Sequence, residues 1–125
     1  MNVVMTATAT ALDVRSLAQL MKALGDETRL RVVALLAHGE LCVCHVQAAL
    51  ELTQPNVSRL FAVLRAAGVV AARREGNWMY YRLADQEHED RRRLLKAIVQ
   101  SFAQRDVLRR DVERLLKTRG PEACK

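Results

Sequence analysis

The hydrophobic and polar positions of this chain follow a helical spacing along most of its length. Apolar residues three and four positions apart predict a first helix that starts after Asp13 and ends at Gly25. Asp26 is a favourable N-cap for a second helix, which Gly39 closes at its C-terminus. The second helix is apolar on nearly every side, so we expect it at the centre of the domain. The apolar residues that repeat along this amphipathic first helix are Val14, Leu17, Met21 and Leu24.

Two shorter helices are predicted next, over residues 42–49 and from Thr53 to Gly68. Thr53 suits an N-cap, and Pro55 is tolerated in a first turn, where its missing N–H would have had no partner. Two short helices joined by residues 51–53, with polar groups at the start of the second, predict a helix-turn-helix. The second helix turns Val57, Leu60, Phe61 and Leu64 inward and leaves Gln54, Asn56, Ser58 and Arg59 on its first turn and outer face.

Residues 69–75 and 77–83 predict two strands joined around Gly76 and Asn77, a pair that accepts the positive φ of a tight hairpin. A basic hairpin directly after the second helix of a helix-turn-helix is typical of a winged helix, in which the hairpin, or wing, lies along the DNA backbone or in the minor groove. The alternative is a satellite hairpin whose aromatic residues simply pack on the core. The basic and aromatic residues of this hairpin are Arg73, Arg74, Arg82, Trp78, Tyr80 and Tyr81.

After Asp85 the pattern is helical again as far as residue 117. Two apolar stripes, over residues 94–102 and 108–116, are rotated relative to each other by roughly a quarter turn. This offset predicts a bend or break at residues 104–106. The pattern does not decide between one bent helix and two separate helices.

Composition agrees with a single helical domain. At 125 residues the chain can bury one core, and its 50% hydrophobic but only 4% aromatic residues favour a core of Leu, Val and Ala. We expect one domain, mainly α with a small β-hairpin, over residues 12–117, between a disordered arm at 1–11 and a flexible tail at 118–125. The net charge of +6 and the pI near 9.8 are compatible with a polyanionic partner.

The N-terminus and the cysteine count indicate a cytoplasmic protein. Residues 1–12 contain no cation and are interrupted by threonines, unlike a signal or transit peptide, and no apolar run approaches the length of a membrane span. The three cysteines are an odd number and do not predict a disulfide framework. We interpret Cys42, Cys44 and Cys124 as ligands, reactive thiols or packing residues.

The polar residues of the helix-turn-helix and the hairpin suit a DNA reader. Gln and Asn side chains pair with adenine edges and Arg with guanine, whereas Ser and a helix N-terminus bind phosphate. The alternative is an ordinary solvated surface. We predict DNA contacts from Gln54, Asn56, Ser58 and Arg59 in the helix and from Arg73, Arg74, Asn77 and Arg82 in the hairpin.

Four separated segments of the chain resemble the ArsR/SmtB metalloregulatory repressors and, within that family, the arsenic-responsive branch. The resemblance covers about residues 17–85, and the segments stand in the family's order. They are ALGDETRL at 23–30, ELCVC at 40–44, QPNVS at 54–58 and REGNWMYYRL at 74–83.

This resemblance implies a homodimeric winged helix-turn-helix whose first and last helices form the dimer interface, in agreement with the two terminal amphipathic segments. It implies a transcriptional repressor, not an enzyme, which binds a near-palindromic operator of an arsenic-resistance operon. Repression would be relieved when As(III) or Sb(III) binds the thiolates of Cys42 and Cys44, with no organic cofactor.

The two thiols of the second segment are two positions apart. On a regular helix this separation is about 200° of rotation, so the sulfurs of Cys42 and Cys44 would point to different sides. They can share one ion only if the first turn of the predicted helix loosens, and a soft, thiol-loving ion would favour that state. The alternative is that Cys42 is a small buried hydrophobe and Cys44 an exposed bystander.

The sequence departs from the family's ligand patterns. Members with this thiol segment often have a third cysteine at the position of Gln47. The third sulfur would therefore come from Cys124 or from a small cellular thiol, or be absent. The family's zinc motif is not matched either, because Asp85 is followed by Glu87 and a lone His88, with no later histidine.

Other functions remain open. One keeps the DNA binding but makes the thiols a sensor of oxidation or of organic arsenicals, although a disulfide between two positions of one helix has poor geometry. A thiol-dependent arsenic enzyme is disfavoured, because we find no Gly-rich phosphate loop and no partnered nucleophile and base. A further open function is that of a dimeric scaffold with no role in DNA binding. His38 and His45 flank the thiols and are candidates to tune them, but we interpret both as surface residues.

Overall fold

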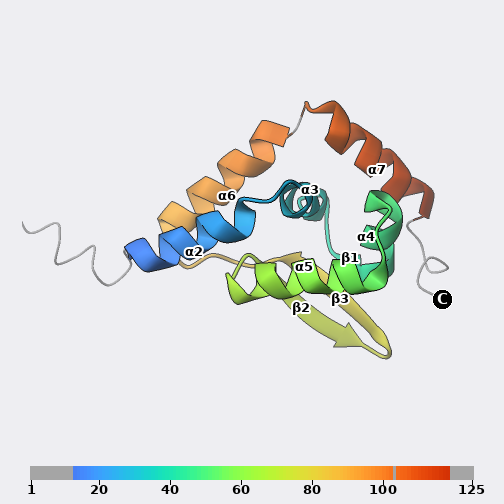
Figure 1. Cartoon of the computed structure of the whole chain (residues 1–125), viewed down its shortest axis with the longest axis horizontal. Coiled ribbons are helices and arrows are strands. Elements are labelled where there is room, and N and C mark those ends of the chain that lie inside the picture. Colours follow the sequence, from blue (N-terminus) through green and yellow to red (C-terminus); the bar gives the residue numbers. More distant parts are fainter. Residues whose placement is uncertain (1–12, 103, 119–125) are drawn as a thin grey trace, which may run out of the picture.

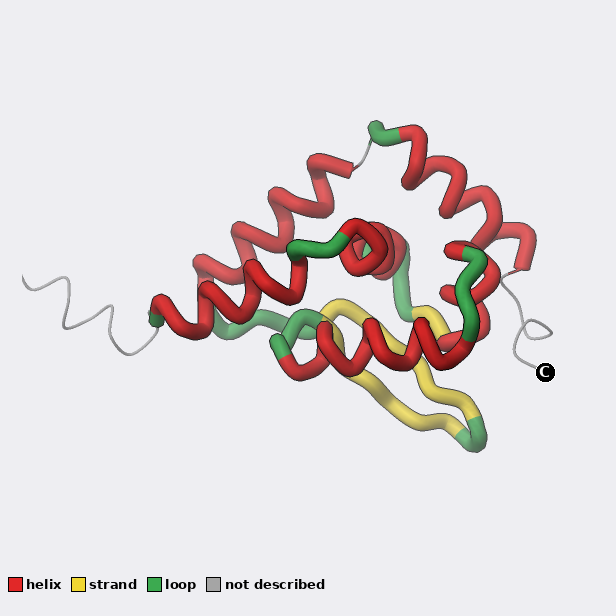
Figure 2. The backbone as a smooth tube through the Cα atoms, viewed as in Figure 1, coloured by secondary structure: helices red, strands yellow, loops and turns green. Residues whose placement is uncertain are grey.

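The computed structural model describes residues 13–102 and 104–118. Over these residues the chain forms a mainly helical domain with one small sheet (Figures 1 and 2). The predicted arm at 1–11, Cys124 and the tail beyond residue 118 lie outside the described residues. In chain order the elements are α2 (Val14–Leu24), α3 (Glu27–Leu36), β1 (Leu41–Cys42), α4 (Val43–Leu50), α5 (Gln54–Ala66), β2 (Val70–Glu75), β3 (Trp78–Leu83), α6 (Glu89–Phe102) and α7 (Asp106–Thr118).

Short polar side chains start the helices where the sequence predicts. The carboxylate of Asp26 accepts a hydrogen bond from the backbone N–H of Arg29 at 3.0 Å and so caps α3. The hydroxyl of Thr53 accepts from the N–H of Asn56 at 3.4 Å and caps α5, with a proline in the first turn. Both predicted caps are confirmed.

Helix α3 lies at the centre of the domain, as predicted. Figure 1 shows it end-on, with α2 and α6 on one side, α4 and α7 on the other, and α5 below. It ends at Leu36, before the predicted stop at Gly39, because a turn over residues 37–38 follows. Large side chains from α3 itself and from four other elements are fully buried and make one continuous core. They include Leu20, Leu35, Leu41, Phe61, Leu64 and Leu115.

The sheet has three antiparallel strands in the order β1-β3-β2. The predicted hairpin is present, and Gly76 in its turn has φ of +62°. The strand β1 was not predicted, because two residues are too few to show an alternating pattern. It pairs Leu41 with Tyr81 and Cys42 with Tyr80 of β3. The first residue of the thiol pair is therefore part of the same sheet as the hairpin.

The C-terminal region forms two helices, and the predicted break at residues 104–106 is confirmed. Figure 1 shows α6 and α7 meeting at an angle. Helix α7 packs on α4 and α3 of its own chain. No helix in the described part of the chain is long and apolar enough to span a bilayer.

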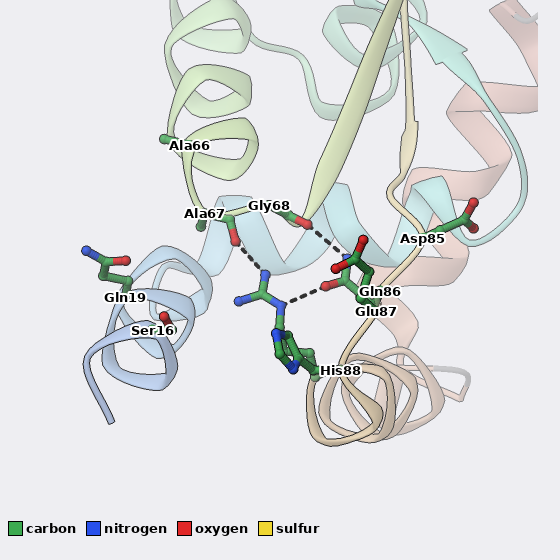
Figure 3. Close-up of a pocket in the computed structure, with 10 residues that line it drawn as sticks. Ser16, Gln19, Ala66, Ala67, Gly68, Asp85, Gln86, Glu87 and His88 are labelled. Atoms are coloured by element: carbon green, nitrogen blue, oxygen red, sulfur yellow. Dashed lines mark hydrogen bonds between the residues drawn. The ribbon is translucent and has the colours of Figure 1, made fainter. Parts of the chain in front are cut away.

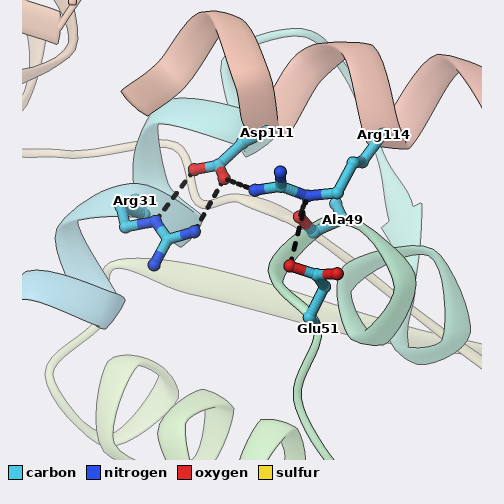
Figure 4. Close-up of polar contacts among 5 residues, drawn as sticks. All are labelled: Arg31, Ala49, Glu51, Asp111 and Arg114. Carbon is cyan, nitrogen blue, oxygen red and sulfur yellow. Dashed lines mark hydrogen bonds and ion pairs between the residues drawn. The ribbon is translucent and has the colours of Figure 1, made fainter. Parts of the chain in front are cut away.

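A buried carboxylate attaches α7 to the central helix (Figure 4). Asp111 is fully buried and accepts hydrogen bonds from Arg31 at 2.7 and 2.9 Å and from Arg114 at 2.6 Å. The hydrogen bond to Asp111 raises the pKa of Arg31 above its usual value. Arg114 also donates to the carbonyl of Ala49 at 2.7 Å. One acid thus joins α7 to α3, and Arg114 extends the contact to the end of α4.

A second polar cluster joins the start of α6 to the end of α5 (Figure 3). Arg91, which is nearly buried, donates to the carbonyl of Ala67 and to the side chain of Gln86. Burial lowers the pKa of Arg91. Gln86 in turn donates to the carbonyl of Gly68 at 2.9 Å. Gly68 has φ of +74°, and a Cβ there would lie 3.2 Å from Arg91, so this junction favours glycine.

We predict that Asp111→Ala lowers the free energy of unfolding by about 2–4 kcal/mol, because Arg31 and Arg114 lose the buried acceptor that they share. Urea denaturation followed by circular dichroism measures the change. Asp106→Ala is the matched control, since Asp106 pairs with Arg109 in an exposed position of the same helix. The control should change stability by less than about 1 kcal/mol. Equal effects of the two substitutions would contradict a structural role for the buried cluster.

Candidate nucleic-acid interface and thiol site

Helix α5 presents the polar face that the sequence predicts. Its inward residues Val57, Leu60, Phe61 and Leu64 are all buried. The amide of Gln54 donates to the hydroxyl of Ser58 at 3.2 Å, so these two side chains lie together on the first turns. The outward side chains are solvent-exposed and accessible to a ligand as large as a duplex: Gln54, Asn56, Ser58 and Arg59.

An aromatic stack sets the position of the hairpin relative to α5. The rings of Phe61 and Tyr81 are parallel within 3°, with centroids 3.9 Å apart. Phe61 is fully buried, and Tyr81 lies in the middle of β3. Because aromatic pairs of this kind add to the burial energy, the stack stabilises the packing of the hairpin against α5. Of the predicted hairpin aromatics, Tyr81 therefore packs on the core.

Arg73 is engaged with carboxylates of its own chain. Its guanidinium donates to Glu40 at 2.6–3.0 Å and to Glu75 at 2.7 Å, and it lies 4.6 Å from the ring centre of Tyr80. These hydrogen bonds, chiefly the one to Glu40, raise the pKa of Arg73, and Arg73 lowers the pKa of Glu40. The contact therefore persists above the usual pKa of Glu40 and is lost as the pH falls through the lowered value. Arg73 connects the hairpin to the residue just before β1.

The other predicted hairpin residues are exposed. In the described part of the chain, no ion pair involves Arg74 or Arg82, and both side chains are open to solvent. Arg74 pairs across the hairpin with Met79, and Arg82 with Ala71. Because side chains alternate along a strand, the two arginines lie on opposite faces of the hairpin. Asn77 is exposed in the turn at the tip.

The two sulfurs of the thiol pair are in direct contact, with the Sγ atoms of Cys42 and Cys44 2.7 Å apart. Cys42 does not belong to the helix. It ends β1 in an extended conformation (φ −88°, ψ 165°) and is the N-cap of α4, so the rotation expected within a helix does not apply. The prediction that the sulfurs converge only when the helix loosens is therefore wrong. For the same reason, the expectation that a disulfide between Cys42 and Cys44 would have poor geometry is also wrong.

His45 is buried, with 8% of its surface exposed, and the interpretation of it as a surface residue is wrong. Its Nδ1 accepts a hydrogen bond from the backbone N–H of Cys42 at 3.2 Å, which is one half of a capping box. A Cys-x-x-His segment lacks the usual Ser/Thr-x-x-Glu/Gln signature of this motif, so sequence analysis could not predict the capping box. His38 is exposed, as expected. His45 thus holds the junction between β1 and α4.

The other His, Asp and Glu side chains of the described residues do not form a metal site. Among residues 13–102 and 104–118, no group of three or more His, Cys, Asp or Glu side chains is placed to hold a metal ion. Asp85, Glu87 and His88 line the polar pocket beside Arg91 (Figure 3). Cys42 and Cys44 supply two converging soft donors, which suit a thiol-binding ion.

Comparison with known proteins identifies the family. Residues 26–72 match the model of the family described as "Bacterial regulatory protein, arsR family". The arsenic resistance transcriptional regulator ArsR1 of Pseudomonas putida is 43% identical over 108 residues, which are 82% of this chain and 83% of that protein. The arsenical resistance operon repressor of Escherichia coli is 51% identical over 67 residues, 53% of this chain and 57% of that protein.

A solved structure supports the same fold. The homodimeric winged helix-turn-helix DNA-binding domain from Mycobacterium bovis has a TM-score of 0.61 and 36% identity, and the match covers 74% of this chain and 82% of that one. The helix pair α4–α5 followed by the hairpin β2–β3 in this chain agrees with a winged helix-turn-helix. This chain therefore belongs to the ArsR family of bacterial regulatory proteins, which are DNA-binding winged helix-turn-helix transcriptional regulators and not enzymes.

Proposed function

We propose that this chain is a homodimeric, cytoplasmic repressor of an arsenic-resistance operon. It binds a near-palindromic operator and leaves it when As(III) or Sb(III) binds Cys42 and Cys44. The observation that carries the proposal is the contact between the two sulfurs at the junction of the sheet and α4. The names of the arsenic-resistance relatives in Pseudomonas putida and Escherichia coli support the choice of inducer.

The donor set fits a thiol-binding ion. Two cysteine sulfurs already converge, so binding needs no unwinding of α4. In this proposal a third sulfur would come from Cys124, six positions after Thr118 at the end of α7 and outside the described residues, or from a small cellular thiol. Six residues span at most about 20 Å, and α7 packs directly on α4. The Cys124→Ser substitution described below tests whether this residue, from either protomer, is the third ligand.

The position of the sulfurs suggests how binding changes the DNA interface. Cys42 belongs to the sheet that contains the wing, and Cys44 to the first helix of the helix-turn-helix. An ion bonded to both sulfurs must lie between them and hold them farther apart than in the present contact. The sheet would then move relative to α4. A preference of about 2–4 kcal/mol for the moved state shifts its population by roughly 30- to 1,000-fold.

Exposed apolar residues support the dimer. Three apolar side chains of α2 face solvent in the single chain, with Val14 82%, Leu17 36% and Met21 42% exposed. Leu17 also lies beside Leu94 of α6 at one pocket. Covering this surface with a second copy would remove apolar area from water. The two reading helices would then meet half-sites about one helical turn apart or a multiple of it.

A second candidate function is a sensor of thiol oxidation, and the same sulfur contact favours it. Oxidation of Cys42 and Cys44 to a disulfide needs no rearrangement of α4. Release of operator by peroxide, reversed by a reductant, would support this function. Release by arsenite under reducing conditions would support the first.

We predict that arsenite releases the operator from the wild-type protein but not from Cys42→Ser or Cys44→Ser, because each substitution leaves one sulfur at the junction. Fluorescence anisotropy of labelled operator in the presence of a phosphine reductant measures release, and circular dichroism controls for folding. Cys124→Ser locates the third ligand: loss of the response assigns it to the tail, and a normal response makes the tail dispensable. A wild-type protein that stays bound at saturating arsenite would contradict the proposed inducer.

We predict different effects for the arginines. Arg59→Ala should lower discrimination between operator and random DNA by about 1–3 kcal/mol, because a base contact is lost. Arg74→Ala should weaken binding to both duplexes alike and reduce the salt slope by about 1, because a phosphate contact is lost. Arg73→Ala is the matched control in the same strand. It should change the salt slope less, since Glu40 and Glu75 already neutralise that guanidinium.

Titration of both duplexes over a range of salt concentrations distinguishes these effects. A change in base preference alone for Arg74→Ala would contradict the placement of the wing on the DNA backbone.

A further inference from the structure

A carboxylate at the opposite edge of the wing sheet holds Arg73 across the face of that sheet. The strand order is β1-β3-β2, and Arg73 belongs to β2, whereas Glu40 immediately precedes β1. Neighbouring strands lie about 4.8 Å apart, so the two outer strands are separated by roughly 10 Å. The guanidinium nevertheless donates to both carboxylate oxygens of Glu40, at 2.6–3.0 Å. The side chain of Arg73 therefore lies across β3.

Two further contacts keep Arg73 in this position. Tyr80 stands opposite Arg73 in the hairpin, and the guanidinium lies 4.6 Å from the centre of its ring. The remaining guanidinium nitrogen donates to Glu75 at 2.7 Å. A single exposed ion pair contributes less than about 1 kcal/mol, but a guanidinium bound by two oxygens and supported by an aromatic ring is held more firmly. A DNA phosphate has to compete with these acceptors for Arg73.

The next arginine of the same strand is not held in this way. Arg74 is exposed, and within the described ranges it takes part in no ion pair. Because side chains alternate along a strand, it lies on the other face of the hairpin from Arg73. The wing therefore carries one arginine that is open to a phosphate and another that acids of the same chain neutralise.

We propose that Glu40 limits sequence-independent DNA binding by holding Arg73 away from the phosphates. Glu40 acts through Arg73 and is thus a positioning residue of the DNA interface, without a contact of its own to the duplex. The inference rests on the placement of the wing on the DNA backbone in the proposed function, and it does not depend on the thiols or on the inducer.

Such a limit is useful to a protein that must find one site among many. Contacts to phosphates strengthen binding to every duplex, whereas contacts to base edges distinguish one sequence from another. A phosphate contact from Arg73 would add affinity without adding discrimination. Random DNA is present in large excess over any operator, so each such contact increases the share of the protein that random DNA retains.

The test is the substitution Glu40→Gln, which keeps the shape of the side chain and removes its charge. The full-length protein is titrated with labelled random duplex over a range of salt concentrations, followed by fluorescence anisotropy, and circular dichroism checks the fold. We expect affinity to rise about 3- to 10-fold per protomer at about 0.15 M salt, because Arg73 then neutralises one more phosphate. The salt slope should steepen by about 1 per protomer.

Two controls separate the release of Arg73 from the simple loss of a negative charge near DNA. The double variant Glu40→Gln/Arg73→Ala should bind as Arg73→Ala alone does, because no arginine is left to be released. Glu75→Gln removes an acid from the same wing but keeps the two-oxygen contact of Glu40 with Arg73. It should therefore raise affinity by less than about 2-fold.

Three results would overturn the inference: an unchanged salt slope for Glu40→Gln, an increase in affinity that persists in the Arg73→Ala background, or an equal increase for Glu75→Gln. Arg74→Ala, titrated in parallel, separates this failure from that of the proposed function. If Arg74→Ala flattens the salt slope while Glu40→Gln leaves it unchanged, only the inference falls. If neither variant changes the slope, the placement of the wing on the DNA backbone falls with it.

Discussion

The DNA interface depends on one constraint: Cys42 belongs both to the sheet that contains the wing and to the start of α4. This residue closes β1, pairs with Tyr80 in the wing sheet, and caps the helix that carries Cys44. Its sulfur touches that of Cys44, and its backbone N–H donates to His45. The junction between the wing and the helix-turn-helix is thus made of the same atoms as the proposed inducer site. A ligand that binds both sulfurs acts on the junction without an intervening path.

Contacts elsewhere in the fold join the elements on either side of this junction to one another. The stack of Phe61 on Tyr81 joins the wing to the reading helix. The buried Asp111 attaches α7 to α3, and Arg114 attaches it to α4. Because packed interiors transmit strain, we expect these contacts to carry a displacement at the two sulfurs to the DNA interface.

Sequence alone was sufficient for the parts of the fold that local pattern determines. Spacing of three and four residues in α5 located both its buried and its exposed face, and the N-cap at Thr53 located its start. The break before α7 followed from the offset of two stripes. Local pattern failed where distant residues decide the structure. The two-residue strand β1 exists only because β3 pairs with it, and the contact of Asp111 with Arg31 joins residues 80 positions apart. The wrong account of the thiols followed from the missing strand, because Cys42 was assigned to the helix that it caps.

Hydrogen–deuterium exchange with and without arsenite tests the central claim most directly, because it reports local opening segment by segment. If the sulfur junction couples the inducer to the DNA interface, arsenite should change the exchange of residues 41–46 and, at the same concentration, of β3, which pairs with β1. Cys44→Ser should abolish both changes. A change confined to other helices, with residues 41–46 and β3 unaltered, would contradict the account.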